Sequence, residues 1–170
     1  MKTTVWRYGF FAFVCAALLF LVILYLGQGL DFDIQEILGY LTIFTSLVFV
    51  YFGIKHFRDR QNEGVISLGQ GVIIGVLISA FAALGFTLAD TIYVMLINPD
   101  FAQQYLDYSL GQMKSELSPE DFETQKVLLE EQFEQYSNPA FNAVVMFSTV
   151  FIIGFIISLI SAVILQRKNQ

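Results

Sequence analysis

The chain has 170 residues, of which 56% are hydrophobic and 14% are charged, and its formal net charge is −6. Soluble domains carry roughly 25% charged residues, so this composition excludes an ordinary soluble protein and indicates one that contacts the lipid bilayer. No segment is rich enough in Lys and Arg to neutralise several phosphates, which excludes nucleic acid as a partner.

Four apolar stretches are each long enough to cross a membrane as a helix, which takes roughly 20 residues. We therefore predict an all-α membrane protein, a single domain over residues 1–170, with transmembrane helices over about residues 8–27, 35–54, 68–97 and 139–166. The first stretch follows a basic segment, as in a signal peptide. It exceeds the roughly 7–15 apolar residues of such peptides and no A-x-A-like site follows it, so we expect it to be retained as a span.

Basic residues divide unevenly between the two ends of these spans, and short loops rich in Lys and Arg stay in the cytoplasm. Seven of the nine lie before the first span, between the second and third, or after the fourth: Lys2, Arg7, Lys55, Arg58, Arg60, Arg167 and Lys168. The other two, Lys114 and Lys126, lie between the third and fourth spans. This division predicts that the N and C termini are both cytoplasmic and that the segment between the last two spans is extracytoplasmic.

The loop between the second and third spans contains a basic cluster, Lys55, Arg58 and Arg60, beside the single histidine, His56. Its simplest interpretation is the charge that orients the spans. Alternatively, the cluster binds anionic lipid headgroups, to which each nearby cation contributes about 1 kcal/mol, or it makes a gating or partner contact.

Small residues recur every four positions in the third and fourth spans, where they allow helices to approach closely in lipid. They are Gly71, Gly75, Ser79 and Ala83 in the third span, and Gly154 and Ser158 in the fourth. We expect the third span to be central and to pack closely on the fourth. The alternative is that these residues form the contact face of a homo-oligomer.

Asp90 is the one ionisable residue inside an apolar stretch, and intramembrane acids are costly enough to be treated as functional by default. If the third span enters the membrane near Leu68, Asp90 lies about 33 Å along the helix axis, close to the outer interface. We interpret it as a structural residue, solvated or capping the adjacent helices. A proton or cation pathway is the alternative.

Residues 98–138 are predicted to form an extracytoplasmic helical hairpin, because each proline follows a residue that favours a helix start: Asn98-Pro99, Ser118-Pro119 and Asn138-Pro139. We expect helices over 99–116 and 119–136, and the third such start opens the fourth span.

The segment between Asn98 and Pro139 holds nine of the fifteen acids and two lysines, a net charge of −7. Aromatic stripes on the two helices are expected to pack against each other, or else to contact the bilayer surface or a partner. The stripes are Phe101, Tyr105 and Tyr108, and Phe122, Leu129, Phe133 and Tyr136.

The run YFGIKHFRDRQNEGVISLGQGVIIG, Tyr51–Gly75, resembles the signature of the domain-of-unknown-function 4199 family of bacterial membrane proteins. The later NPDFAQQY, Asn98–Tyr105, is also similar to its members. The resemblance implies a small multi-span protein of the cell inner (cytoplasmic) membrane, with no activity, cofactor or substrate assigned.

Catalytic motifs are absent: the sequence contains no G-x-S-x-G, H-E-x-x-H or Walker pattern. Cys15 has no companion at metal-ligand spacing, and Asp31, Asp33 and Glu36 are interpreted as a solvated turn rather than a divalent-cation site. We expect neither a metal nor a cofactor.

The preferred function is a non-enzymatic scaffold or accessory subunit that binds a protein partner through the outer hairpin, and the alternative is a small oligomeric carrier or channel that uses Asp90.

Overall fold

The computed structural model describes residues 1–136 and 138–167, and its elements there are helical. They are α1 (Lys2–Leu26), α2 (Phe32–Gln61), α3 (Leu68–Ile92), the π-helical η1 (Tyr93–Ile97), α4 (Phe101–Glu116), α5 (Pro119–Tyr136) and α6 (Pro139–Leu165). Four helices are long and apolar enough to cross a membrane, namely α1, α2, α3 continued by η1, and α6. The predictions of an all-α fold and of four span-like helices are therefore confirmed.

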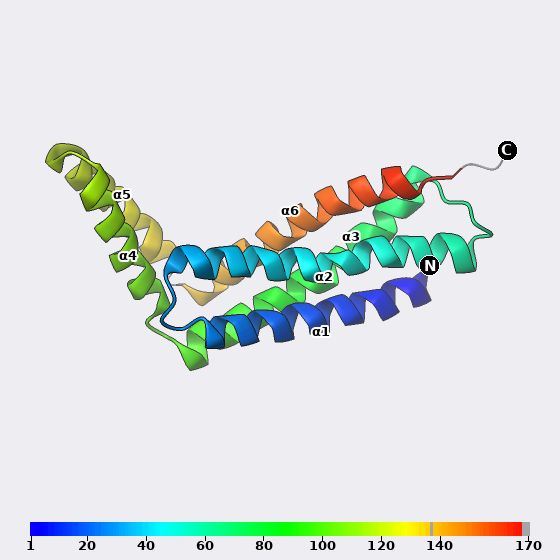
Figure 1. The fold of residues 1–170 in the computed structure, drawn as a ribbon, viewed down its shortest axis with the longest axis horizontal. Helices are drawn as coiled ribbons and strands as arrows, with labels where there is room; N and C mark the ends of the chain where they lie inside the picture. Colours follow the sequence, from blue (N-terminus) through cyan, green and yellow to red (C-terminus); the bar gives the residue numbers. More distant parts are fainter. Residues whose placement is uncertain (137, 168–170) are drawn as a thin grey trace.

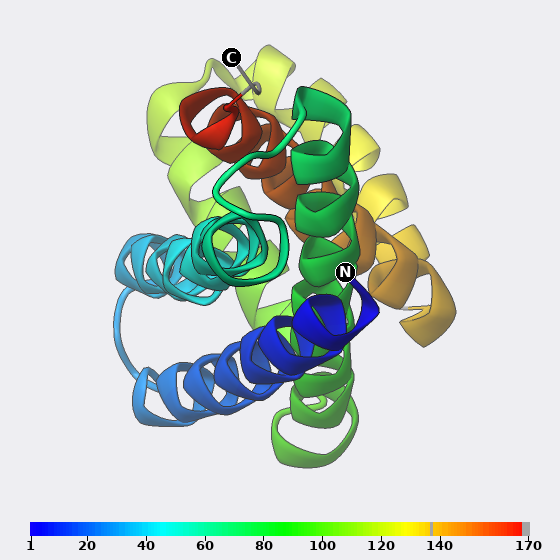
Figure 2. The same cartoon turned by 90° about the vertical axis from the view of Figure 1, so that its right-hand side faces the viewer.

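The four long helices lie side by side in a bundle whose two ends differ (Figures 1 and 2). One end holds the N-terminus, the loop between α2 and α3, and the end of α6. The other end holds the loop between α1 and α2, and beyond it stand α4 and α5, tilted away from the bundle axis. Six of the seven basic residues assigned above to the cytoplasmic side belong to the first end, and Lys168 lies outside the described residues.

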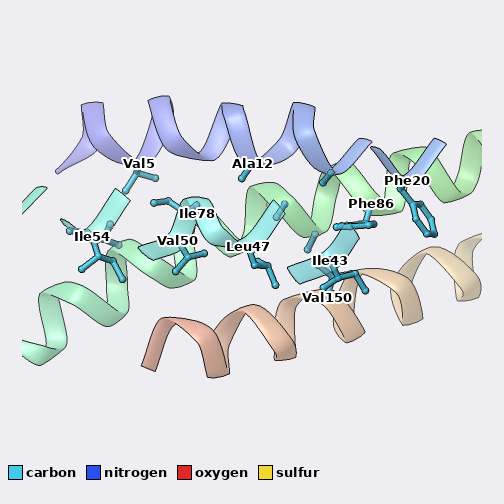
Figure 3. Packing of buried hydrophobic residues seen from close by; sticks show 14 of the residues in the cluster. Val5, Ala12, Phe20, Ile43, Leu47, Val50, Ile54, Ile78, Phe86 and Val150 are labelled. Atoms are coloured by element: carbon cyan, nitrogen blue, oxygen red, sulfur yellow. The ribbon is translucent and has the colours of Figure 1, made fainter. Parts of the chain in front are cut away.

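Helix α3 is the centre of the bundle, because it packs against the other three long helices and its contacts with α6 and α1 are the most extensive in the structure. Its inward residues Ile78, Ala82 and Phe86 are fully inaccessible to solvent. Figure 3 shows Ile78 and Phe86 among apolar side chains from the other three long helices, including Ala12, Leu47 and Val150. The core therefore runs along α3.

Helices α3 and α6 are antiparallel and approach closely along their small residues. A Cβ atom added at Gly75 would lie 2.6 Å from Ser158 Cβ, and one added at Gly71 would lie 2.8 Å from Ala162 Cβ. Gly154 lies against Ser79 in the same way, and the Oγ atoms of Ser79 and Ser158 are 3.3 Å apart. Ala83, the next small residue along α3, is also fully buried. Each step of four residues along α3 thus matches a step of four back along α6, which sets the register of the two helices.

Local capping explains where two of the long helices begin. Ser67 and Gln70 form a reciprocal capping box at the start of α3, and the Asn138 side chain accepts hydrogen bonds from the Ala140 and Phe141 backbone N–H groups at the start of α6. These side chains satisfy N–H groups that have no partner within the helix. Both predicted starts are confirmed.

The predicted start of α4 at Asn98-Pro99 is wrong. Helix α4 begins at Phe101, with Asp100 at the N-cap position. Asn98 instead ends the preceding helix, since its backbone N–H donates to Tyr93 O at 2.8 Å and closes the π-helical turn of η1. Its side-chain amide donates to Gln104 Oε1 at 3.2 Å.

Candidate functional site

The candidate site is built around Asp90, which lies in the last turn of α3 and is 7% exposed. Asn142, in the first turn of α6, donates a hydrogen bond from Nδ2 to Asp90 Oδ2 at 2.6 Å. The pair follows from the register of α3 and α6, because continuing the steps of four residues from Gly75 and Ser158 brings these two turns together. Asp90 is therefore held between two helices at the end of the bundle that bears α4 and α5.

Asp90 and Asn142 line a partly open cavity of about 320 Å³ that is bordered by side chains from five helices and from η1. Helix α2 contributes further polar groups, Gln35 and Glu36, and α6 contributes Thr149. Six aromatic rings complete much of the wall: Phe20, Phe32, Tyr40, Tyr93, Phe101 and Tyr105. The volume falls within the range of about 300–1,000 Å³ that is usual for small-molecule sites.

The first turns of α4 lie over this cavity because their aromatic residues pack on the bundle. The ring of Phe32, at the start of α2, lies 5.9 Å from Phe101, 5.4 Å from Tyr105 and 5.1 Å from Tyr108, measured between centroids. Across the α4–α5 contact, Tyr105 meets Phe133 at 5.7 Å. The aromatic stripe of α4 therefore packs on α2 as well as on α5, where the sequence alone led us to expect the two stripes to pack against each other.

The ionisable side chains that line this cavity are acidic rather than basic. Among the described residues that line it, the ionisable groups are the carboxyls of Asp90 and Glu36 and the hydroxyls of three tyrosines, and none is Lys, Arg or His. Burial raises the pKa of the Tyr105 hydroxyl, and the Glu36 and Asp33 carboxylates raise it further. This effect shows that carboxylates from the start of α2 act on the α4 side of the cavity.

A second cavity, of about 510 Å³, lies beneath α4 and α5 on the other side of Asp90. Four residues line both cavities: Asp90, Phe101, Tyr105 and Asn142. The hydrogen-bonded pair of Asp90 and Asn142 therefore stands between two spaces.

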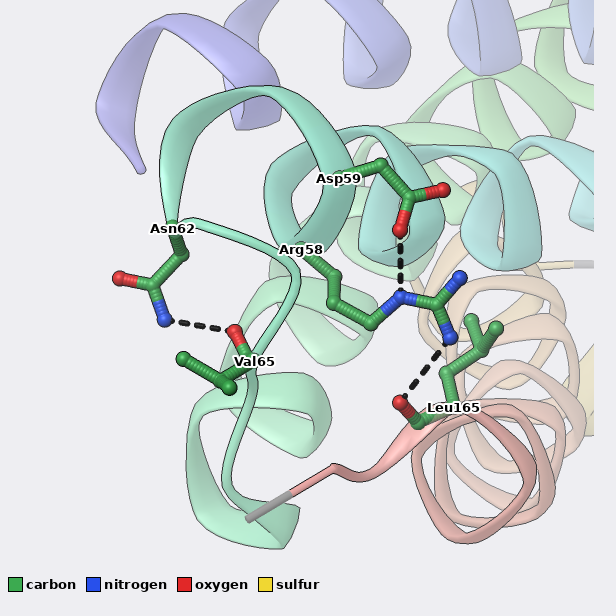
Figure 4. Close-up of polar contacts among 5 residues, drawn as sticks. All are labelled: Arg58, Asp59, Asn62, Val65 and Leu165. Atoms are coloured by element: carbon green, nitrogen blue, oxygen red, sulfur yellow. Dashed lines mark hydrogen bonds and ion pairs between the residues drawn. The ribbon is translucent and has the colours of Figure 1, made fainter. Parts of the chain in front are cut away.

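The basic cluster at the opposite end of the bundle separates into residues with different surroundings. Lys55 and Arg60 are exposed, whereas Arg58 is 8% exposed. Arg58 donates from Nε to Asp59 Oδ1 at 2.6 Å and from Nη1 to the Leu165 carbonyl oxygen at 3.3 Å (Figure 4). Because the last carbonyls of a helix have no partner within it and carry negative charge, Arg58 stabilises the end of α6.

A short backbone bridge completes this end of the bundle. The Ile66 N–H donates to Arg167 O and the Arg167 N–H donates to Ile66 O, each at 3.0 Å. Asn62 Nδ2 donates to Val65 O at 2.7 Å in the same loop (Figure 4). The α2–α3 loop and the end of α6 are thus tied together through backbone groups.

Sequence reasoning identified Asp90 but not Asn142 or the aromatic wall around it. One signal was available, since Asn142 is a lone amide near the start of an otherwise apolar span. The wall gave no such signal, because its rings come from segments far apart in the chain. Within residues 1–136 and 138–167, no group of three or more His, Cys, Asp or Glu residues could hold a metal ion.

Comparison with known proteins gives a family. A family model described as a protein of unknown function, DUF4199, matches residues 7–167, nearly the whole chain. The chain belongs to this family. No curated protein and no solved structure matches it. The resemblance read from Tyr51–Gly75 is therefore confirmed, and the family brings no assigned activity.

Proposed function

We propose that this protein is a multi-pass protein of the bacterial inner membrane with cytoplasmic termini, and that α4 and α5 form an extracytoplasmic hairpin. The four span-like helices support the first part. The charge division supports the orientation, because the basic residues of α1, α2 and the end of α6 gather at one end of the bundle and the acidic α4 and α5 stand at the other (Figure 1).

Within the membrane the protein acts as a non-enzymatic scaffold or accessory subunit that binds a protein partner through this hairpin. The observation that carries the proposal is that neither α4 nor α5 contains a fully buried residue, although both are well-formed helices of 16 and 18 residues. Helices of this length that lack a packed face of their own are stabilised mainly by what they pack against. A partner would bury the side chains of α4 and α5 that their contacts with α2 and with each other leave accessible.

The outer face of α5 indicates the kind of partner. Val127 and Leu128 are 54% and 56% exposed, and acids such as Glu123 and Glu131 surround them on the same helix. Apolar anchors within a charged rim are typical of protein interfaces. With a net charge of −7 in this segment, a second copy would bring like charges together, so the partner presents a basic surface.

Site-specific photocrosslinking in native membranes tests this proposal. Benzoylphenylalanine in place of Leu128 should give one discrete adduct with a basic-surfaced protein, and the adduct should disappear when Glu123 and Glu131 are changed to Lys. The same probe at Ile160, which is 55% exposed on α6, is the control and should give no such adduct. The absence of an adduct from position 128, or an adduct made only with another copy of this chain, would refute the proposal.

A second candidate function is an oligomeric carrier or channel with Asp90 in its pathway. One observation favours it, namely that Asp90 lines both cavities. Several copies would have to surround that pathway. Solute flux into proteoliposomes that Asp90→Asn abolishes would support this function, and flux no greater than that of empty vesicles would argue against it.

A further inference from the structure

The cavity of about 320 Å³ beside Asp90 combines three properties that together define a ligand class. Its ionisable lining residues include two acids and no bases, much of its wall is aromatic, and its volume is modest. None of these properties depends on the partner proposed for the hairpin.

Asp90 is an acidic group largely removed from solvent, and no Lys, Arg or His occurs among the described residues that line the cavity with it. The neutral amide of Asn142 donates a hydrogen bond to its Oδ2. Burying a charged group is costly unless a countercharge or several hydrogen bonds compensate it. Because Glu36 adds a second carboxyl and the described lining residues include no Lys, Arg or His, a bound cation would favour the charged form of both acids.

The aromatic wall favours an organic cation. Tyrosine and phenylalanine faces attract ammonium groups, with a contribution that grows from about 0.5–1 kcal/mol at exposed sites to about 2 kcal/mol where the pair is desolvated. Phe32, Tyr93 and Phe101 are held by ring contacts to one another, with Tyr93 and Phe101 centroids 5.5 Å apart. A metal ion would need more oxygen ligands than two carboxylates and an amide supply, and no metal-binding group of three residues occurs within the described part of the chain.

The size of the cavity limits the ligand. A water molecule occupies about 30 Å³ of liquid, so about 320 Å³ holds roughly ten waters or an organic molecule of about ten non-hydrogen atoms.

We propose that this cavity is a binding site for a small monovalent organic ammonium ion, with Asp90 and Glu36 as its anionic groups and the aromatic rings as its walls. Tyr105 and Phe101 of α4 cover the site, so that the bound cation contacts both the bundle and the hairpin.

Choline, with seven non-hydrogen atoms, is a suitable probe because an uncharged compound of the same shape, 3,3-dimethylbutan-1-ol, exists. Binding of radiolabelled choline to the purified full-length protein is measured in dodecyl maltoside, which carries no ammonium group. We expect saturable binding, with the uncharged compound competing at least tenfold more weakly than choline. Equal competition by the two compounds, or no saturable binding, would overturn the proposal.

Three variants locate the site. Asp90→Asn and Glu36→Gln should each weaken choline binding at least tenfold, and Glu36 lies on the surface, so its variant tests the proposal even if Asp90→Asn fails to fold. Asp107→Asn is the control, because Asp107 is exposed on α4 outside the cavity and the change removes the same charge. Wild-type affinity in both Asp90→Asn and Glu36→Gln would overturn the assignment. The measurement uses the protein without any partner, so its outcome leaves the proposed scaffold function to its own test.

Discussion

The close approach of α3 and α6 can be tested by adding one carbon atom to it. In Gly75→Ala, the new Cβ would lie 2.6 Å from Ser158 Cβ and Oγ and 3.1 Å from Ser158 Cα. Since the Cα belongs to the backbone, rotation of the serine side chain does not relieve the contact, and α6 has to move. Overpacking of this kind costs about 1–3 kcal/mol, whereas replacing a helical glycine by alanine gains about 1 kcal/mol in helix propensity.

Gly69→Ala is the matched control because Gly69 lies on the same helix and an added Cβ there meets nothing within 4 Å. We expect Gly75→Ala to be less stable than Gly69→Ala by about 1–3 kcal/mol. The free energy of unfolding is measured by SDS titration in micelles, with the fluorescence of Trp6 as the signal. The Trp6 ring lies 5.3 Å from that of Phe81 on α3, so its emission reports the packing of α1 on α3.

A double-mutant cycle identifies the contact responsible. In a Ser158→Gly background the Cβ and Oγ that face Gly75 are gone, and the cost of Gly75→Ala should become smaller. If Gly75→Ala and Gly69→Ala shift the unfolding transition equally, or if the Ser158→Gly background leaves the cost of Gly75→Ala unchanged, then the packing of α3 on α6 described above is incorrect.

Two further predictions concern Arg58 and Tyr105. Arg58→Met should lower the free energy of unfolding by about 1.5–3 kcal/mol, because it removes the charge-assisted hydrogen bonds to Asp59 and Leu165 O. Arg60→Met removes the same charge from an exposed position and should change the free energy of unfolding by less than about 0.5 kcal/mol. Equal losses in the SDS titration would contradict the role of Arg58 at the end of α6. Burial raises the pKa of the Tyr105 hydroxyl, and the Glu36 and Asp33 carboxylates raise it further. The neutral form of Tyr105 therefore contributes stability that is present below the unfolded-state pKa of about 10. This stability is lost as the pH rises through the higher folded-state pKa. The difference in 295 nm absorbance between wild type and Tyr105→Phe should therefore titrate at higher pH than free tyrosine. Titration at or below that of free tyrosine would contradict the position of Tyr105 close to the Glu36 and Asp33 carboxylates.

The helices and several of their ends could be predicted from the sequence because these features depend on neighbouring residues. Apolar stretches of sufficient length produced the four span-like helices, and the side chains of Ser67 and Asn138 cap α3 and α6 through bonds to residues two or three positions away. Asn98 was misjudged for a reason that is also local, since the π-helical turn that it closes cannot be distinguished by composition from the end of an α-helix.

The site could be predicted only in part. Asp90 was conspicuous as a lone acid in an apolar stretch, but its partner Asn142 lies 52 residues further along the chain. The basic cluster was read as one unit, whereas a contact from Arg58 to Leu165, 107 residues away, gives that residue a role of its own. Likewise, the aromatic stripe of α4 packs on Phe32 of α2.

The sequence by itself thus determined the family, the helical class, the number of span-like helices and the uneven distribution of charge. The tertiary structure alone decided which side chains meet at Asp90 and that they line a cavity. The physical reason is the register of the antiparallel helices: it is set by Gly71, Gly75 and Gly154 lying against small residues of the opposite helix, and it brings together groups whose spacing along the chain carries no local pattern.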